Sequence, residues 1–317
     1  MSAPEVVTFG ESMALLLAEP GHALDAALHF RRSVAGAESN VAVGLARLGH
    51  AVGWFGRVGD DAFGHGILRA LRAEGVDVSR ARIDDTAPTG LLVRDFHAER
   101  PVQVLYYRSG SAGSRLSPAD VDEAWLGGAR LLHVTGITPA LSRSAREATE
   151  AVFDVAARAG VTMSFDPNVR RKLASERRWG ELLPRFGGRA HLVFAGVDEA
   201  ELITGTSDPE RAAGWFLERG ARLVVIKDGG RGAWASDGTR SWRCPATRVT
   251  AADPVGAGDA FDAGFLSGYL RGLAVADALA EAAVVGAHVV QAPGDLEGLP
   301  TARQRDAAAR PGQHVDR

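Results

Sequence analysis

Cysteine and lysine are both scarce in this sequence of 317 residues, which has one cysteine, Cys244, and two lysines, Lys172 and Lys227. A single cysteine excludes an internal disulfide and fits a reducing compartment, so we expect a cytoplasmic protein. A P-loop requires a lysine followed by serine or threonine. Leucine and aspartate follow the two lysines here, so a P-loop is excluded.

The sequence also lacks an excess of positive charge and long hydrophobic runs. Lys and Arg total 36 against 39 Asp and Glu, which gives a net charge of −3. Without a polybasic surface, nucleic acid is not an expected partner. No apolar run reaches the roughly 18 residues of a membrane span, so we expect no membrane contact. With 46% hydrophobic and 24% charged residues, the chain can build one large core.

Apolar runs typical of buried strands alternate with amphipathic segments typical of helices along most of the chain. This alternation predicts an α/β fold with a central, mostly parallel sheet and helices on both faces. The expected strands are 6–10, 52–58, 131–134, 161–166, 192–195 and 223–227. The expected helices are 40–48, 62–74, 142–159, 176–186, 198–204, 210–219, 260–270 and 277–291.

Two hairpins interrupt the alternation, at 89–107 and 232–243, because no helix separates their β-rich runs. A hairpin inserted into a pattern that otherwise predicts a parallel sheet indicates a separate small sheet. We therefore expect a small β lid formed from about 12–32 and 88–110. Its unpaired strand edges suggest a homo-oligomer that forms through the lid.

The lid and the α/β alternation together predict one domain over residues 1–305. Residues 301–317 are polar and lack apolar periodicity, and we expect a polar C-terminal tail over 306–317.

A glycine-bearing loop, Gly256-Ala257-Gly258, leads into the expected helix at 260–270, with Asp259 directly after it. Glycines at a helix N-terminus allow an anion to approach free backbone N–H groups. A carboxylate beside such an anion can take a proton from an attacking hydroxyl, so the loop suggests phosphoryl transfer to an alcohol. The alternative is an ordinary first-turn aspartate that complements the helix dipole.

Polar and glycine-rich loops gather where the expected strands end, at 36–40, 166–168, 229–232 and 256–259. Ligands of open parallel sheets bind at this edge. We therefore expect these four loops to surround one binding site.

Two of these segments resemble the signatures of a known family. Gly36-Ala37-Glu38-Ser39-Asn40-Val41-Ala42 with Leu45-Ala46-Arg47-Leu48-Gly49, and Asp253-Pro254 with Gly256-Ala257-Gly258-Asp259-Ala260-Phe261, are similar to those of ribokinase-like (PfkB) carbohydrate kinases. The similarity extends from about Val6 to Pro300. It implies the ribokinase-like three-layer fold with a β lid, an ATP-dependent kinase reaction, and Mg²⁺ as the cofactor.

Within that family, the chain most resembles 2-keto-3-deoxygluconate kinases. The shared segments are Gly10-Glu11-Ser12-Met13, Tyr106-Tyr107-Arg108, Gly136-Ile137-Thr138-Pro139, Asp166 with Asn168 and Arg170, and Gly294-Asp295. The resemblance implies transfer of the γ-phosphate of ATP to the C6 hydroxyl of this sugar acid. The alternatives are a kinase of another sugar or sugar acid, such as a fructokinase or ribokinase, and a non-catalytic sugar- or nucleotide-binding relative.

The resemblance also implies roles for individual residues. Asp259 would be the general base, and Gly256, Ala257 and Gly258 would form the anion hole. Glu199 would organise Mg²⁺ through water, and Asp253 would lie near a monovalent cation such as K⁺. The residues expected at the sugar acid are Gly36, Ala37, Asn40, Tyr106, Arg108, Arg170 and Asp295. Those expected along ATP are Asn168, Arg170, Lys227, Gly229, Gly230, Arg231 and Gly232, together with the anion hole.

Simpler interpretations remain for several of these residues. Tyr106 could pack in its strand, Arg108 and Arg170 could be surface charges, and Lys227 could be the solvated end of a strand. The sequence also departs from the family pattern. Gly196 replaces the asparagine of an Asn-x-x-Glu motif, and Val169 and Leu92 stand where tyrosine is often found.

Overall fold

A computed structural model describes residues 3–96 and 102–308. Its central sheet has eight strands in the order β14-β13-β12-β11-β10-β9-β1-β4. Neighbouring strands from β12 to β4 pair in parallel, whereas β13 and β14 are antiparallel. The mostly parallel sheet expected from the sequence is therefore confirmed. The strands are β1 (Val6–Phe9), β4 (Val52–Phe55), β9 (Leu131–Thr135), β10 (Thr162–Asp166), β11 (Leu192–Gly196), β12 (Leu223–Lys227), β13 (Ala233–Ser236) and β14 (Ser241–Cys244).

Both faces of this sheet are buried, because successive side chains of its strands enter different cores. In β11, Val193 and Ala195 belong to one hydrophobic cluster, and Leu192 and Phe194 belong to the other. The first cluster is covered by α3 (Glu123–Gly127), α4 (Ile137–Leu141), α5 (Arg143–Ala159), α6 (Glu176–Gly187), α7 (Val197–Thr204) and α8 (Pro209–Leu217). The second is covered by α1 (Ala37–Arg47), α2 (Ala62–Ala73), α9 (Ala257–Leu270) and α10 (Val275–Val289).

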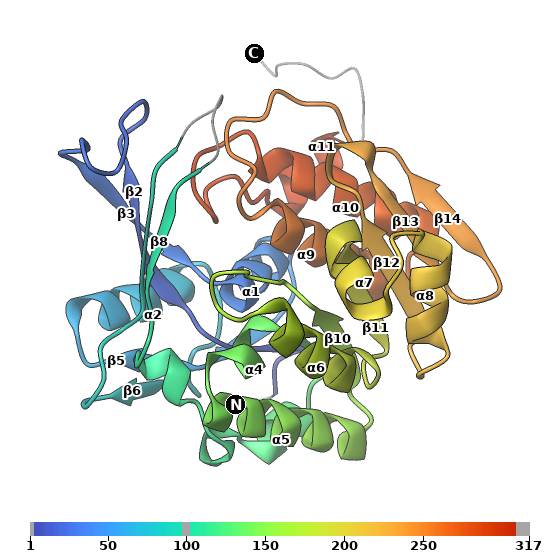
Figure 1. Ribbon diagram of the computed structural model, residues 1–317, viewed down its shortest axis with the longest axis horizontal. Helices are drawn as coiled ribbons and strands as arrows, with labels where there is room; N and C mark the ends of the chain where they lie inside the picture. Colours follow the sequence, from blue (N-terminus) through green and yellow to red (C-terminus); the bar gives the residue numbers. More distant parts are fainter. Residues whose placement is uncertain (1–2, 97–101, 309–317) are drawn as a thin grey trace.

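A separate four-stranded sheet stands beside the central one, at the left of Figure 1. Its order is β3-β2-β7-β8, formed by β3 (Phe30–Ala35), β2 (Met13–Ala18), β7 (Leu91–Arg94) and β8 (Val104–Tyr107). Met13, Leu15 and Leu17 of β2 pack with Leu92 on its buried face. This small sheet is the one expected from segments 12–32 and 88–110, although β3 continues to Ala35. The turn between β7 and β8 lies outside the described residues.

Three boundaries differ from the sequence-based expectation. The expected strand at 52–58 is divided, because the chain leaves the central sheet at Gly56 and β5 (Arg57–Gly59) pairs with β6 (Arg82–Asp84). Helix α1 begins at Ala37 instead of residue 40. Helix α9 begins at Ala257 instead of residue 260, because Gly256 adopts a left-handed conformation (φ 83°) that starts the helix directly.

The expected polar tail over 306–317 overlaps a helix, α11 (Ala302–Ala308), so it does not begin at residue 306; residues 309–317 lie outside the described part of the chain. This short helix has no apolar periodicity, but buried Arg305 pairs with Glu281 of α10 at 3.3 Å. Among the helices of the described part of the chain, none combines the length and hydrophobicity that a membrane-spanning helix needs.

Candidate active site

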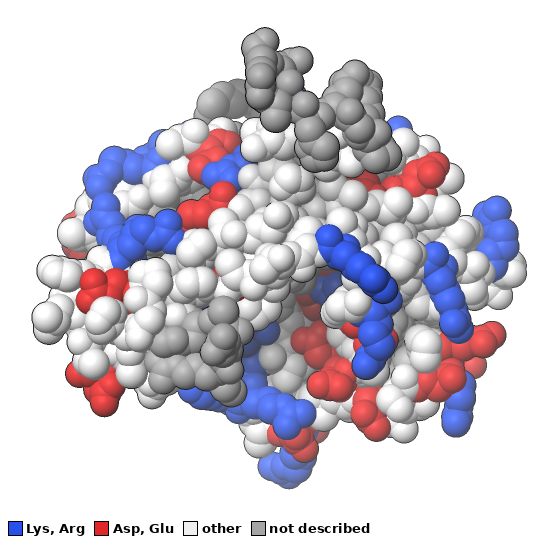
Figure 2. Space-filling model, turned by 90° about the horizontal axis from the view of Figure 1, so that it is seen from above, with Lys and Arg blue, Asp and Glu red and all other residues white. Residues whose placement is uncertain are grey.

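A cavity of about 850 Å³ lies between the small sheet and the carboxyl ends of the central strands. The hollow near the middle of Figure 2 is bordered by acidic and basic side chains. All four loops that we expected to surround one site contribute to its lining. The small sheet contributes Met13, Leu92, Val104 and Tyr106.

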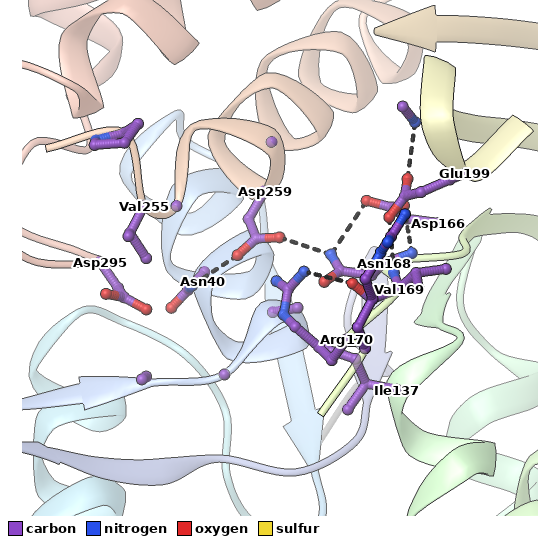
Figure 3. A pocket seen from close by; sticks show the side chains of 18 of the residues that line it. Asn40, Ile137, Asp166, Asn168, Val169, Arg170, Glu199, Val255, Asp259 and Asp295 are labelled. Atoms are coloured by element: carbon purple, nitrogen blue, oxygen red, sulfur yellow. Dashed lines mark hydrogen bonds between the residues drawn. The ribbon is translucent and has the colours of Figure 1, made fainter. Parts of the chain in front are cut away.

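Asp259 lies in the first turn of α9, facing this cavity, and is 5% exposed. Its Oδ2 accepts a hydrogen bond from Asn40 Nδ2 at 2.8 Å, and its Oδ1 accepts one from Asn168 Nδ2 at 3.1 Å (Figure 3). Burial raises the pKa of Asp259, while the nearby Arg170 and the bond from Asn40 lower it. Two neutral amides thus orient the carboxylate without neutralising it, as a proton acceptor requires.

The N-terminus of α9 provides backbone donors beside this carboxylate. Gly256 and Gly258 line the cavity, and Ala257 lies between them in the first turn. A Cβ atom on Gly256 would lie 3.0 Å from the carbonyl oxygen of Asp295, so glycine permits this close approach. The Ala257 N–H donates to the Pro254 carbonyl oxygen at 3.4 Å, so an anion in this part of the cavity would meet the N–H groups of Gly256 and Gly258 and the positive end of a helix of 14 residues.

The lining of the cavity includes six residues that were expected at the sugar: Gly36, Ala37, Asn40, Tyr106, Arg108 and Asp295. Arg108 is 8% exposed and forms an ion pair with Glu11, and its guanidinium lies over the ring of Tyr106, 5.4 Å from the centroid. The interpretation of Arg108 as a surface charge is therefore wrong. Sequence reasoning did not assign Glu11 to the site, although it quoted the motif that contains this residue.

The lining also includes Asn168, Arg170, Lys227, Gly229 and Arg231, all expected along ATP. Figure 3 shows Asp295 and Glu199 on opposite sides of Asp259. Gly230 and Gly232 are not among the lining residues. Gly232 has a structural reason to be glycine, since its φ is 111° and a Cβ atom would lie 2.1 Å from the Cys244 carbonyl oxygen.

Lys227 is not the solvated end of a strand, because its Nζ donates to Asp166 Oδ2 at 2.9 Å and to Asp262 Oδ1 at 3.0 Å. Burial opposes the charge on Lys227, but the carboxylates outweigh it and raise the pKa of the ammonium. Burial also opposes the charge on Asp166, yet Lys227 lowers the pKa of that carboxyl to about 2. Burial raises the pKa of Asp262 well above its usual value, and the charge of Asp166 adds to this although Lys227 opposes it.

Glu199 has the chemistry expected of a residue that holds Mg²⁺ through water. Its Oε1 accepts from the Val169 N–H at 2.7 Å and its Oε2 from the Gly196 N–H at 2.8 Å. Each oxygen keeps a lone pair, and the residue lines the cavity. The departure at Gly196 therefore removes a side chain but keeps a backbone contact to Glu199.

The structure places a guanidinium beside Asp253, the residue expected near a monovalent cation such as K⁺. Its Oδ2 lies 2.7 Å from Arg94 Nη2 and accepts from the Gly294 N–H at 3.0 Å. Its Oδ1 accepts from the Val255 N–H at 3.2 Å. Asp253 is fully buried and does not line the cavity, and its nearest described cation is the Arg94 guanidinium.

The other two departures from the family pattern, Leu92 and Val169, both line the cavity, where they present apolar side chains. Sequence reasoning missed several polar lining or supporting residues, and two of them, Glu38 and Arg94, are buried. Glu38 belongs to a segment that was quoted for its family resemblance. Arg94 carried no signal, since it is the last residue of an ordinary strand.

Comparisons with known proteins agree with this geometry. A family model described as pfkB family carbohydrate kinase matches residues 3–302. A 2-dehydro-3-deoxygluconokinase of Bacillus subtilis (strain 168) is 45% identical over 94% of this chain and 93% of its own length. A protein of the same name from Thermoproteus tenax is 36% identical over 95% of this chain and 93% of its own.

Solved structures resemble the whole fold. The PfkB protein from Polaromonas sp. JS666 is 40% identical, with a TM-score of 0.88 over 96% of this chain and 100% of that one. A protein of E. coli described as a ribokinase II, in complex with ATP and Mg²⁺, is 26% identical, with a TM-score of 0.90 over 97% and 98%.

Proposed function

Because the chain belongs to the pfkB family of carbohydrate kinases, we propose that it transfers the γ-phosphate of ATP to the C6 hydroxyl of 2-keto-3-deoxygluconate. The relatives at 45% and 36% identity carry the name of that activity and match nearly the full chain, which supports the choice of substrate. The observation that carries the proposal is the placement of Asp259, a buried carboxylate oriented by two amides at the N-terminus of α9.

In the proposed reaction, Asp259 takes the proton of the sugar hydroxyl as that oxygen attacks the γ-phosphorus. The N–H groups of Gly256, Ala257 and Gly258 stabilise the charge of the transferring phosphoryl group. Bound Mg²⁺ supplies further neutralisation of the phosphate charge, and Glu199 would hold it through water. Arg170 lies between the two ends of the cavity and contributes a positive charge near Asp259.

The acid end of the sugar would lie near Tyr106 and Arg108, with Gly36, Ala37 and Asn40 at its hydroxyls and Asp295 opposite. A guanidinium can hold a carboxylate with two parallel hydrogen bonds. In the structure Arg108 already pairs with Glu11, which fixes its position and leaves the substrate to compete for its remaining donors.

ATP would extend over Asn168, Lys227, Gly229 and Arg231 at the opposite end. Gly230 and Gly232 belong to the same loop as Gly229 and Arg231 but do not line the cavity themselves. The small sheet would cover the sugar and exclude water, which would otherwise compete as the nucleophile. The proposal places the enzyme in the cytoplasm, where ATP and reduced cysteine are both found.

A coupled assay tests the substrate. ATP consumption would be measured with 2-keto-3-deoxygluconate, gluconate, fructose and ribose, each with and without EDTA. The proposal expects the highest kcat/KM with 2-keto-3-deoxygluconate and no turnover in EDTA. A higher kcat/KM with fructose or ribose would show that this sugar is the substrate instead of 2-keto-3-deoxygluconate. No turnover with any of the sugars would indicate a binding protein.

The small sheet also supports a proposal about assembly. Phe30, Leu105 and Tyr107, on its two edge strands, are 39%, 37% and 62% exposed. Burying such side chains together with unpaired strand edges favours a homo-oligomer formed through the small sheet. Sedimentation of the wild type and of a Leu105→Asp, Tyr107→Asp variant would test this, since only the wild type should associate.

A further inference from the structure

One arginine of the small sheet reaches both halves of the candidate site. Arg94 is the last residue of β7, and its side chain is 1% exposed. Its Nη2 donates to Asp253 Oδ2 at 2.7 Å and to Asp295 Oδ1 at 3.0 Å. Asp253 lies three residues before Gly256 of the anion-binding loop, and Asp295 lines the cavity at the proposed sugar end.

The two loops that Arg94 contacts are also bonded to each other. The Gly294 N–H donates to Asp253 at 3.0 Å, and the backbone of Gly256 rests against that of Asp295. A displacement of either loop would therefore move both the anion hole and the carboxylate at the sugar end. Without Arg94, two carboxylates would remain in a buried place with no described cation beside them, and they would repel each other.

A purely stabilising role accounts poorly for this arginine. Within the described part of the chain, Arg94 Nε and Nη1 are buried and have no hydrogen-bond acceptor. Unsatisfied buried donors make the folded state less stable, and a buried ion pair is often no better for stability than apolar residues of similar volume. The arrangement is instead suited to hold two loops in a fixed relation.

We propose that Arg94 is a positioning residue for phosphoryl transfer: from β7 it sets the anion-binding loop at Asp253 and the sugar-end carboxylate of Asp295 in register with each other. This inference rests on the site proposed above. It assigns to the small sheet a role in building the anion hole, in addition to covering the sugar. Arg94 does not line the cavity, so its effect on the reaction passes through the two aspartates.

The test measures steady-state kinetics of Arg94→Met, together with the affinity for a non-hydrolysable ATP analogue. We expect kcat to fall and KM for the sugar to rise, with a combined loss on the order of 100-fold in kcat/KM, because small displacements of reacting groups have effects of this size. The affinity for the ATP analogue should change little. Arg94→Lys, which keeps the charge, should recover part of the loss, and free guanidinium ions should do the same for Arg94→Ala.

Arg31 provides a matched control. It lies on β3 of the same small sheet and contacts the same loop, through the carbonyl oxygen of Pro293 and the carboxylate of Glu297, but it is 49% exposed. Arg31→Met should leave kcat and KM near the wild-type values. Equal losses in the two variants would show that any contact between the sheet and the loop suffices, and would overturn the inference.

Two further outcomes decide the matter. A variant Arg94→Met with a lower Tm and unchanged kinetic constants would make Arg94 a structural residue only. If that variant does not fold, Arg94→Lys and Asp295→Asn are combined, and non-additive losses support the inference whereas additive ones contradict it. Asp259→Asn distinguishes a failure of this inference from a failure of the proposed function. If Asp259→Asn is inactive and Arg94→Met is fully active, the proposed function stands and only the positioning role of Arg94 is contradicted.

Discussion

Two buried cations flank the N-terminus of α9, and each lies between two carboxylates. Lys227 contacts Asp166 and Asp262, and Arg94 contacts Asp253 and Asp295. Lys227 and both of its partners belong to the central sheet and α9, which are parts of one layered core. Arg94 belongs to the small sheet, and its two partners lie in loops of the core. Asp253 precedes α9, and Asp295 follows α10.

The protonation of the two clusters differs as well. In the lysine cluster, burial raises the pKa of Asp262 well above its usual value, whereas Lys227 outweighs burial at Asp166 and lowers the pKa of that carboxyl to about 2. In the arginine cluster, burial raises the pKa of Asp295 to about 6, although Arg94 opposes this, so most of Asp295 is ionised at neutral pH. The comparison suggests that Lys227 mainly supports the core beneath the nucleotide, whereas Arg94 mainly sets the geometry of the site.

The residue between the clusters should show the largest effect. Asp259→Asn is expected to lower kcat by roughly 10²–10⁴-fold, the usual loss when a general base is removed, with ATP-analogue affinity nearly intact. Because burial raises the pKa of Asp259 above its ordinary value of 3.8, the acid limb of the wild-type rate should lie above that pH. A variant that retains more than about half of the wild-type kcat would exclude this role.

Lys227→Met tests whether the lysine cluster mainly stabilises the fold. Removing the cation leaves the Asp166 charge buried without its ammonium, so we expect the free energy of unfolding to fall by roughly 3–5 kcal/mol. Urea denaturation measures this loss. Lys172→Met is the matched control, since Lys172 is exposed and should tolerate the change. An equal Tm for both variants would refute the distinction between core support and site geometry.

Glu38 differs from the carboxylates of both clusters, because it is a buried acid whose hydrogen bonds come from hydroxyl groups instead of a cation. Thr135 Oγ1 and Thr138 Oγ1 both donate to its Oε1, at 2.8 and 2.7 Å, and burial raises its pKa to about 7 from 4.5. A raised folded-state pKa contributes stability that is fully present below pH 4.5 and lost as the pH rises through 7.

Glu38→Gln cannot undergo this loss. Its stability relative to wild type should therefore increase between pH 5 and pH 8, by up to about 3 kcal/mol. Thermal unfolding at both pH values tests the sign, with the exposed Glu147→Gln as a control. A stability difference that is the same at pH 5 and pH 8 would mean that Glu38 titrates normally.

Arg108→Ala tests whether the small sheet also reads the substrate. A charge-assisted hydrogen bond contributes about 1.5–3 kcal/mol, so kcat/KM for 2-keto-3-deoxygluconate should fall roughly 10- to 100-fold. A neutral ketose should lose much less. Equal losses of kcat/KM with both sugars would mean that Arg108 only supports the sheet through Glu11. No loss with either sugar would mean that Arg170, and not Arg108, recognises the carboxylate of the substrate.

The smallest effect concerns monovalent cations. Arg94 forms an ion pair with the carboxylate of Asp253. We therefore expect the wild-type enzyme to have nearly equal kcat values in K⁺ and in tetramethylammonium salts. Arg94→Ala leaves two carboxylates without their guanidinium and should respond to K⁺ more strongly than the wild type. A large K⁺ activation of the wild type would show that the cation binds without this carboxylate.

The sequence predicted the layers of the fold because strand and helix periodicities are local. It missed the break at Gly56, where the apolar run continues, and α11, which is held by the contact of Arg305 with Glu281. Side chains at strand ends and in the glycine loops were predicted to converge, and they do. The pairing of Arg94 with Asp295, separated by 201 residues, depends on tertiary packing that no local pattern encodes.

The scarcity of lysine has a practical consequence for spectroscopy. Lys227 is held as a buried ammonium and should resist acylation, so Lys172 is the one side-chain amine left for a fluorescent label. Its Nζ donates to the carbonyl oxygen of Val104 on β8, from the segment that follows β10. The fluorescence of a dye attached there would respond to any change in the contact between β8 of the small sheet and the segment that follows β10 of the central sheet.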